Sequence, residues 1–314
     1  MSVRQEYVLV NGARLWTSTQ GTGVPLVLCH GGPGLWDYLE PLAQMLEDVT
    51  TVHRYDQRGC GRSAAMPPYD VATMVGDLEA LRRRWGHTEW ILGGHSWGAD
   101  LALTYALAYP SRVRGLIYTS GTGLDLDWRE EHRLNQRARL TSTQQLELAR
   151  LKARLTRARG ADFEEADHTY CRLLWSTDFA DRRRAFELAG RLVQAGRHPN
   201  YEVNRAILED WRRIVQEGEL RRRARQLSVP VLIVHGDADP RPSSIASRLA
   251  QQISGARLTI MPSVGHFPFI EAPESYSSTV KSFLRLVDPS TSAPAARPLP
   301  SSALPDGEDR AGDS

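Results

Sequence analysis

The sequence predicts an α/β fold in which a mostly parallel, doubly wound sheet carries an inserted helical cap. Three observations predict this class. Short apolar runs alternate with helix-like segments up to Gly123, a charged and helix-like region follows, and the alternation resumes at Val229. A chain of 314 residues is long enough for one such domain with an insertion, or for two domains. The simplest arrangement is one α/β domain that the cap interrupts.

The first predicted strands form a hairpin. Residues 7–10 and 14–19 flank Asn11 and Gly12, and an Asn-Gly pair between two strands is typical of a tight β-turn. The apolar run at residues 25–29 follows, which indicates a strand buried on both faces of the sheet. The sequence therefore places a hairpin ahead of the first buried strand.

Helices and strands then alternate along the chain. We expect a helix near residues 38–46, a strand at 51–55 and a helix at 71–85. The last of these has one apolar stripe, formed by Val71, Met74, Val75, Leu78 and Leu81. The predicted elements that follow are a strand at 90–92, a helix at 99–108, a strand at 115–119, and then helices without a strand over residues 124–225.

The α/β pattern resumes after the cap, with predicted strands at 229–234 and 257–261 and helices at 244–252 and 273–287. We therefore assign residues 1–123 and 226–287 to the α/β core and residues 124–225 to the cap. Residues 288–314 are rich in Pro, Ser, Ala and Gly and have few large apolar groups, which predicts a disordered tail.

Charge and cysteine content exclude several classes of partner. The 39 basic and 37 acidic residues give a net charge of +2, so neither nucleic acid nor a membrane is an expected partner. The arginine runs lie in helix-like segments among acidic residues, which is typical of solvated helix faces. The three cysteines lack C-x-x-C spacing and predict neither a disulfide framework nor a metal site, and we expect no cofactor.

The sequence predicts a cytoplasmic protein. Its first residues have no apolar signal core, and no segment is long and apolar enough to cross a membrane.

The segment Gly94-His95-Ser96-Trp97-Gly98 points to a nucleophile. An apolar run precedes it and an apolar helix-like stretch follows it, so Ser96 occupies a sharp strand-to-helix turn. Such a turn exposes a serine hydroxyl above the sheet edge, where a base and a substrate carbonyl can both reach it.

A serine nucleophile needs a histidine base and a carboxylate that orients the base. Loops that follow later strands supply both residue types: Asp237 and Asp239 come after the strand at 229–234, and His266 comes after the strand at 257–261. The carboxyl ends of parallel strands meet at one edge of a sheet, so these side chains arrive beside Ser96. Asp125, which follows the strand before the cap, is a more distant alternative for the acid.

An oxyanion hole needs two backbone N–H donors. The N–H of Trp97 is one, because it starts a helix directly after the nucleophile. The glycine-rich loop at residues 30–34 supplies the second.

The strings HGGPG at residues 30–34, DQRGCGRS at 56–63 and GHSWG at 94–98, with Gly265-His266-Phe267, resemble the proline iminopeptidase branch of the α/β-hydrolase superfamily. The resemblance covers the α/β core. It implies Ser96 as nucleophile, His266 as base and Asp239, three residues after Gly236, as acid. It also implies N–H donors at Gly32 and Trp97, and release of an N-terminal proline or small residue from a peptide or amide.

Relatives of this kind bind the free α-amino group of the substrate with carboxylates of the cap. The first candidates for that role here are Glu202, Glu209 and Asp210, in a segment that also contains Asn204 and Trp211. Other cap carboxylates that could serve are Asp125, Asp127, Glu130 and Glu131.

Two other functions stay open at this point. One is an esterase or amidase that acts on a small metabolite with the same triad. The other, from a different class, is a non-catalytic binding protein with the same fold.

Overall fold

The computed structural model describes residues 3–193 and 197–288. Apart from Asp288, the tail for which the sequence predicts disorder lies outside the described residues.

Eight strands form one twisted sheet in the order β1-β2-β4-β3-β5-β6-β7-β8. The two pairs β1–β2 and β2–β4 are antiparallel, and all other neighbours are parallel. The predicted mostly parallel α/β sheet is therefore confirmed. The strands are β1 (Arg4–Val10), β2 (Ala13–Gly21), β3 (Val24–Cys29), β4 (Thr50–Tyr55), β5 (Trp90–His95), β6 (Val113–Thr119), β7 (Val231–Gly236) and β8 (Arg257–Met261).

The chain enters the sheet through the expected hairpin. Val10 pairs with Ala13 across a turn in which Asn11 has φ +45° and Gly12 has φ +79°. Positive φ at both central residues defines the turn that matches the twist of two antiparallel strands, and asparagine and glycine tolerate it best.

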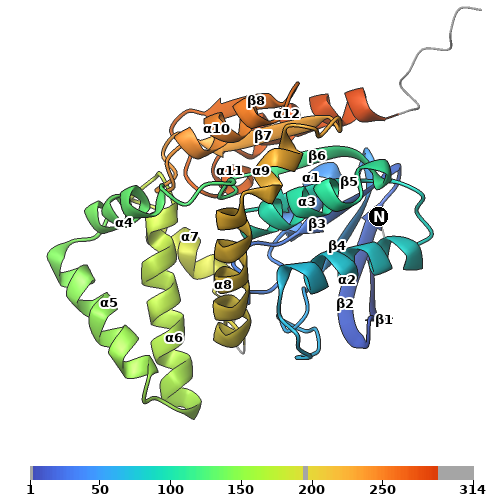
Figure 1. Cartoon of the computed structure of the whole chain (residues 1–314). Coiled ribbons are helices and arrows are strands. Elements are labelled where there is room, and N and C mark those ends of the chain that lie inside the picture. Colours follow the sequence, from blue (N-terminus) through green and yellow to red (C-terminus); the bar gives the residue numbers. More distant parts are fainter. Residues whose placement is uncertain (1–2, 194–196, 289–314) are drawn as a thin grey trace, which may run out of the picture.

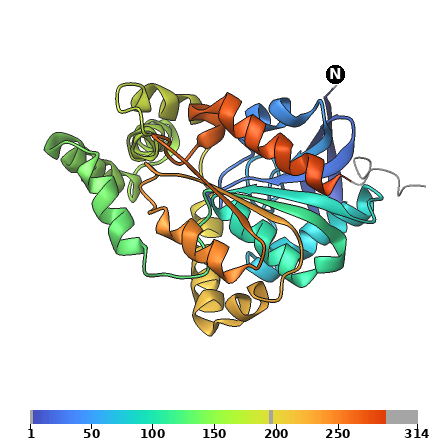
Figure 2. The ribbon, with the colours of Figure 1, turned by 90° about the horizontal axis from the view of Figure 1, so that it is seen from above.

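Helices cover both faces of the sheet (Figure 2). One face is covered by α1 (Glu40–Leu46), α11 (Pro268–Glu271) and α12 (Pro273–Val287). The other is covered by α2 (Val71–Arg84), α3 (Trp97–Ala108) and α10 (Ser244–Gln252). Both faces of the central strands are thus buried, which explains why those strands read as continuous apolar runs. A short 3₁₀ turn, η1 (Pro110–Arg112), leads from α3 into β6.

The chain between β6 and β7 is helical and lies over one end of the sheet (Figure 1). It contains α4 (Arg129–Ala138), α5 (Ser142–Leu155), α6 (Gly160–Trp175), the 3₁₀ turn η2 (Ser176–Asp178), α7 (Ala185–Leu192), α8 (Tyr201–Glu217) and α9 (Glu219–Ala224). Helix α8 buries Val203, Ile207 and Trp211 in the same apolar cluster as α2 and α3. Helices α5 and α6 form a limb with a small apolar cluster of their own.

Candidate active site

Ser96 occupies a sharp turn between β5 and α3, with φ +56° and ψ −127°. The turn needs glycine on both sides. A Cβ added to Gly94 would lie 2.1 Å from the carbonyl oxygen of Gly98, and one added to Gly98 would lie 2.0 Å from the carbonyl oxygen of Cys29. Because Gly94 and Gly98 have no side chains, β5, α3 and the end of β3 can pack closely together. This packing holds Ser96 in its strained conformation.

His266 and Asp239 meet beside this turn. The Nδ1 atom of His266 lies 2.6 Å from Oδ2 of Asp239, and both side chains are buried. Burial alone raises the pKa of the Asp239 carboxyl, but the neighbouring His266 and Arg241 outweigh burial and hold that pKa below its usual value. Asp239 is therefore ionised and fixes the orientation of the imidazole ring.

The other two carboxylates considered for this position point elsewhere. Asp237 accepts a hydrogen bond from the backbone N–H of Ser263 at 2.7 Å, so it caps the loop that leads to His266. Asp125 forms an ion pair with Arg221 at 2.7 Å. Neither carboxylate contacts the His266 ring in the described structure, and Asp239 does.

Arg241 and Asp178 complete the surroundings of Asp239, and sequence reasoning missed both. The Nη1 atom of Arg241 lies 2.9 Å from Oδ1 of Asp178 and 3.4 Å from Oδ1 of Asp239. The backbone N–H of Arg241 donates to the same Asp239 oxygen at 2.9 Å, and the N–H of His266 donates to the carbonyl of Asp178 at 2.7 Å. Arg241 could have been predicted as a neighbour of the acid, because it follows Asp239 by two residues. No pattern in the sequence predicts that Asp178, in η2, lies beside them.

A chain of hydrogen bonds joins the glycine-rich loop to His266 through His95. Nε2 of His95 lies 2.7 Å from the carbonyl oxygen of His266, which can only accept, so Nε2 carries the proton. Nδ1 of His95 then accepts from the hydroxyl of Tyr38 at 2.7 Å, and that hydroxyl accepts from the N–H of Gly31 at 2.9 Å. No pattern in the sequence indicates this polar connection of His95.

The two predicted oxyanion donors lie on either side of Ser96. Gly32 lines the cavity with φ +52°, and Gly31 is so close to the turn that an added Cβ would lie 2.8 Å from Cβ of Ser96. Trp97 is the first residue of α3, so its N–H has no acceptor within the helix. Gly32, Ser96 and Trp97 all line one cavity.

His30 holds the glycine-rich loop in place. Its Nε2 accepts from the backbone N–H of Gln57 at 3.1 Å, so Nδ1 carries the proton and donates to the carbonyl of Gly31 at 3.0 Å. The side chain of Gln57 donates to the carbonyl of His30 and accepts from the indole N–H of Trp97 at 3.0 Å. The loop and the start of α3 are thereby tied to one another.

Helix α8 of the cap is docked on the same loop. The backbone N–H of Asn200 donates to the carbonyl of Gly34 at 2.7 Å, and its side chain donates to the carbonyl of Gly59 at 2.9 Å. The side chain of Asn204 donates to the carbonyl of Pro33 at 2.8 Å. The position of α8 over Ser96 is therefore fixed by polar contacts as well as by its apolar face.

The charged residues of the DQRGCGRS string are paired, with one another or with nearby aspartates. Asp56 accepts from the backbone N–H of Arg62 at 2.7 Å and from its Nε at 2.6 Å, and it also accepts from the N–H of Asp37 at 2.7 Å. Arg58 makes a two-point contact with Asp77, at 2.8 and 2.7 Å. These side chains therefore brace a loop beside the site.

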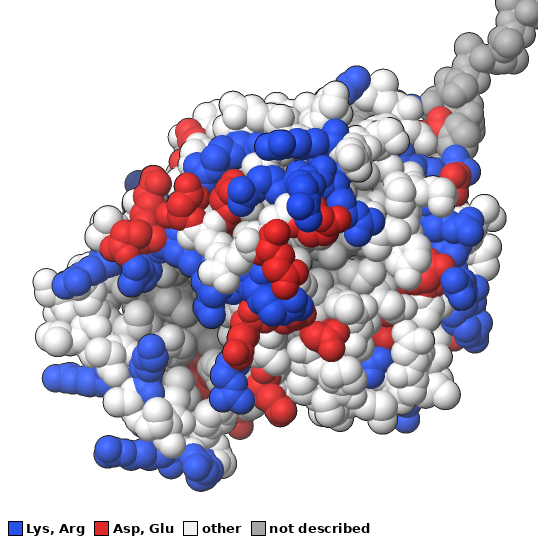
Figure 3. All heavy atoms as spheres, viewed as in Figure 1, with Lys and Arg blue, Asp and Glu red and all other residues white. Residues whose placement is uncertain are grey.

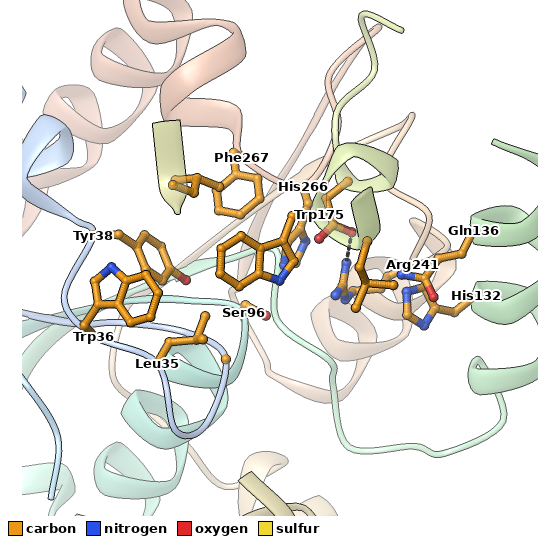
Figure 4. A pocket seen from close by; sticks show the side chains of 14 residues that line it. Leu35, Trp36, Tyr38, Ser96, His132, Gln136, Trp175, Arg241, His266 and Phe267 are labelled. Carbon is orange, nitrogen blue, oxygen red and sulfur yellow. Dashed lines mark hydrogen bonds and ion pairs between the residues drawn. The ribbon is translucent and has the colours of Figure 1, made fainter. Parts of the chain in front are cut away.

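Two cavities meet at Ser96. The first, which we call the apolar cavity, has a volume of about 270 Å³ and is lined by Ser96 and His266 with Leu35, Trp36, Leu174, Trp175, Leu192 and Phe267. Figure 4 shows Ser96 and His266 between Leu35, Trp36 and Tyr38 on one side and Arg241, Gln136 and His132 on the other. A substrate carbonyl above Ser96 can therefore reach apolar walls and the imidazole together.

The second cavity, which we call the arginine-lined cavity, has a volume of about 520 Å³ and lies on the Trp97 side of Ser96. Its walls include Trp97, Trp128, Arg129, Arg133, Trp211 and Arg212. Two carboxylates line the cavities in the described residues, Asp100 here and Asp178 in the apolar cavity. Both are engaged, Asp100 by Tyr118 and Thr122 and Asp178 by Arg241.

The predicted amine-binding carboxylates lie on faces of α8 that do not line the cavities of Ser96. The residues of this helix that line the arginine-lined cavity are Asn204, Leu208, Trp211 and Arg212, and Glu202, Glu209 and Asp210 are not among them. Asp210 instead accepts from the backbone N–H of Val71 at 2.9 Å at the start of α2. The reason is helical periodicity, because residues 204, 208, 211 and 212 share one side of the helix and 202, 209 and 210 lie on others. Their role in binding an amine stays a prediction.

One cluster has the composition of a metal site. The side chains of Glu164, His168 and His198 bring their ligand atoms within 4.8 Å of one another. None of them lines either cavity of Ser96.

No helix in residues 3–193 and 197–288 is long and apolar enough to cross a membrane.

The chain is similar to known α/β hydrolases in sequence. The family described as alpha/beta hydrolase fold matches residues 24–273. A proline iminopeptidase of Saccharolobus solfataricus is 28% identical over 298 residues, which cover 90% of this chain and 93% of the relative.

Two solved structures share the fold. A meta-cleavage product hydrolase from Pseudomonas fluorescens IP01 superposes with a TM-score of 0.70 at 22% identity, over 90% of this chain and 97% of the other. A proline iminopeptidase of Mycobacterium smegmatis superposes with a TM-score of 0.62 at 22% identity, over 91% and 99% of the two chains. At this level of identity the structural likeness concerns the fold alone.

Proposed function

The chain belongs to the α/β-hydrolase family, and we propose that it is a serine hydrolase that cleaves an ester or amide through an acyl-enzyme. The observation that carries this proposal is the contact of 2.6 Å between His266 Nδ1 and Asp239, with Ser96 and His266 on the wall of one cavity. Because Asp239 occupies Nδ1, the other ring nitrogen of His266 is left to act on Ser96.

In the first half of the reaction, His266 accepts the proton of the Ser96 hydroxyl as the serine oxygen attacks the substrate carbonyl. The N–H groups of Gly32 and Trp97 stabilise the negative charge that develops on the carbonyl oxygen. His266 then gives its proton to the leaving alcohol or amine, and the acyl group stays on Ser96.

In the second half, a water molecule takes the place of the leaving group. His266 accepts a proton from this water, whose oxygen attacks the acyl carbon, and the same proton returns to Ser96 as the carboxylic acid departs. Asp239 stays ionised throughout and stabilises the positive imidazolium.

The relatives suggest a narrower function, the release of an N-terminal proline or small residue from a peptide or amide. The full-length likeness to a proline iminopeptidase and the motifs around Ser96 support it. A free α-ammonium held in a partly buried site needs a carboxylate partner. Asp100 and Asp178, which line the cavities, already have partners, so neither carboxylate is free to bind an amine. The lack of a free carboxylate among the described lining residues favours the second candidate, an esterase or amidase whose substrate needs no free amino group.

A substrate comparison separates these possibilities. We expect the protein to hydrolyse p-nitrophenyl hexanoate faster than L-prolyl-p-nitroanilide, and a fluorophosphonate to stop the ester hydrolysis. Faster cleavage of the prolyl anilide would favour the aminopeptidase. No turnover of either substrate, together with no reaction with the fluorophosphonate, would favour a non-catalytic binding protein.

A further inference from the structure

The arginine-lined cavity contains cationic groups that the proposed chemistry does not use. Arg129, on the first turn of α4, and Arg212, near the middle of α8, approach the cavity from two different helices. Arg133, one turn further along α4, lines the same cavity and contacts Glu130. Arg241 is also present, but its charge is taken up by Asp178 and Asp239.

Of the four arginines that line this cavity among the described residues, Arg129 and Arg212 have no carboxylate partner. Neither forms an ion pair with any residue that the structure describes. Burial lowers the pKa of Arg129, and the nearby charge of Arg212 lowers it further. Two guanidinium groups that face one cavity and have no carboxylate partner repel each other, and an anion between them would relieve this repulsion.

The next arginine along α8, Arg213, has carboxylate partners. Arg213 pairs with Asp210 at 2.7 Å and with Glu217 at 2.5 Å on the outer side of the helix. Figure 3 shows a similar mixture of basic and acidic side chains over much of this face, with basic groups bordering the hollow beside the helical limb. Arg212 therefore differs from its neighbour Arg213, which has two carboxylate partners.

The position of His266 indicates which half of a substrate enters this cavity. His266 lines the apolar cavity and is not among the described residues that line the arginine-lined cavity. Since the leaving group receives its proton from His266, it must lie in the apolar cavity. The acyl half then extends past Trp97 toward Arg129 and Arg212.

We propose that the arginine-lined cavity binds a carboxylate on the acyl half of the substrate, through Arg129 and Arg212. This inference rests on the proposed function, because it places the acyl group on Ser96. The guanidinium group presents parallel N–H donors that match the two oxygens of a carboxylate. The preferred substrates are therefore esters or amides of dicarboxylic acids, and substrates with an ammonium group in the acyl half are disfavoured.

The test uses three p-nitrophenyl esters with acyl chains of equal length, those of hexanoate, adipate and 6-aminohexanoate. We expect kcat/KM for the adipate monoester to exceed that for hexanoate by about tenfold to a hundredfold, the range of charge-assisted hydrogen bonds. The 6-aminohexanoate ester is expected to be the poorest of the three. The preference for adipate should shrink as salt is added, because Arg212 is exposed.

Variants locate the effect. In Arg129→Gln/Arg212→Gln the ratio between the adipate and hexanoate esters should fall toward one. Arg213→Gln is the matched control, one residue further along α8, and should keep the wild-type ratio. A second readout avoids turnover: free adipate should slow the reaction of the wild-type protein with a fluorophosphonate more strongly than 1,6-hexanediol does, and the double variant should lose this protection.

The outcomes separate the two proposals. Hydrolysis of hexanoate with no preference for adipate, or an equal ratio in the double variant and the wild type, would overturn the carboxylate site and leave the serine hydrolase standing. If the protein neither turns over the esters nor reacts with the fluorophosphonate, the proposed function fails. Calorimetry with free adipate then tests separately whether the arginine-lined cavity binds a carboxylate. Binding by the wild type but not by the double variant supports the anion site. Equal heats in both proteins overturn it.

Discussion

The imidazole of His95 donates a hydrogen bond to the backbone carbonyl of His266 at 2.7 Å, so two histidines from different strand ends are directly linked. Burial lowers the pKa of His95 well below its ordinary value, and His266 lowers it further, so His95 stays neutral. A neutral ring with its proton on Nε2 is the form that this contact requires. We infer that His95 positions the loop that carries His266.

Replacing His95 should therefore slow the reaction without weakening substrate binding. In His95→Ala, the carbonyl of His266 loses its hydrogen-bond donor, and we expect kcat to fall on the order of 10- to 100-fold with KM nearly unchanged. His53→Ala is the control, because His53 is a buried histidine that contacts Thr19 and His87, away from Ser96. Equal kcat in His95→Ala and wild type would remove the positioning role.

The two aspartates of the acid loop should behave very differently. Asp239→Asn keeps the shape of the site but removes the charge that supports the His266 imidazolium, so kcat should drop by a factor on the order of 10⁴. Asp237→Asn should be mild, because the Asp237 carboxylate accepts from the Ser263 N–H and does not contact His266. If Asp237→Asn proves to be the crippling change, the acid has been assigned to the wrong residue.

Asp210 and Glu209 of α8 should not contribute to catalysis. Asp210→Ala leaves the N–H of Val71 at the start of α2 without its acceptor, and we expect a loss of about 1 kcal/mol in the free energy of unfolding. Glu209→Gln should change neither stability nor kcat/KM, since Glu209 is exposed and lines neither cavity. A large rise in KM for an aminoacyl anilide in either variant would restore these carboxylates to an amine site.

Asp100 should make stability depend on pH. Burial raises the pKa of this carboxyl from 3.8 to about 7, against the hydrogen bonds from Thr122 and Tyr118. A pKa raised in the folded state means that the folded protein holds the proton more tightly. The stabilisation is therefore complete below pH 4 and is lost as the pH rises to about 7.

Chemical denaturation at several pH values tests this dependence. From pH 4 to pH 7 the free energy of unfolding of the wild type should fall relative to Asp100→Asn, by a few kcal/mol at most. Asp48→Asn serves as the control, because Asp48 is exposed and pairs with Lys281. Parallel pH profiles for wild type and Asp100→Asn would contradict the raised pKa.

The parts of the fold and site that local sequence encodes could be predicted. The turn at Ser96 is one, because the glycines that permit its geometry are its neighbours in the chain. The strand ends that carry Asp239 and His266 are another, because an apolar run followed by a polar loop marks the edge of a parallel sheet. The contact of 2.6 Å between these two residues is what that pattern led us to expect.

Contacts that depend on how helices pack could not be predicted. Asp178 reaches Arg241 across 63 residues of sequence, and no local pattern specifies that meeting. Arg129 and Arg212 come together only because α4 and α8 converge over Ser96. Which residues of α8 share a face can be predicted from the sequence. A helical projection from Asn204 separates the residues that line the cavity from the acidic residues.

Mass spectrometry of the intact protein after treatment with a fluorophosphonate tests the central claim most directly. We predict a single adduct on Ser96 and complete loss of ester hydrolysis in the labelled protein. Ser96→Ala should remain folded, take up no label and lose activity by a factor on the order of 10⁴ or more. Labelling at another residue, or substantial hydrolysis by folded Ser96→Ala, would contradict the role of Ser96 as the nucleophile.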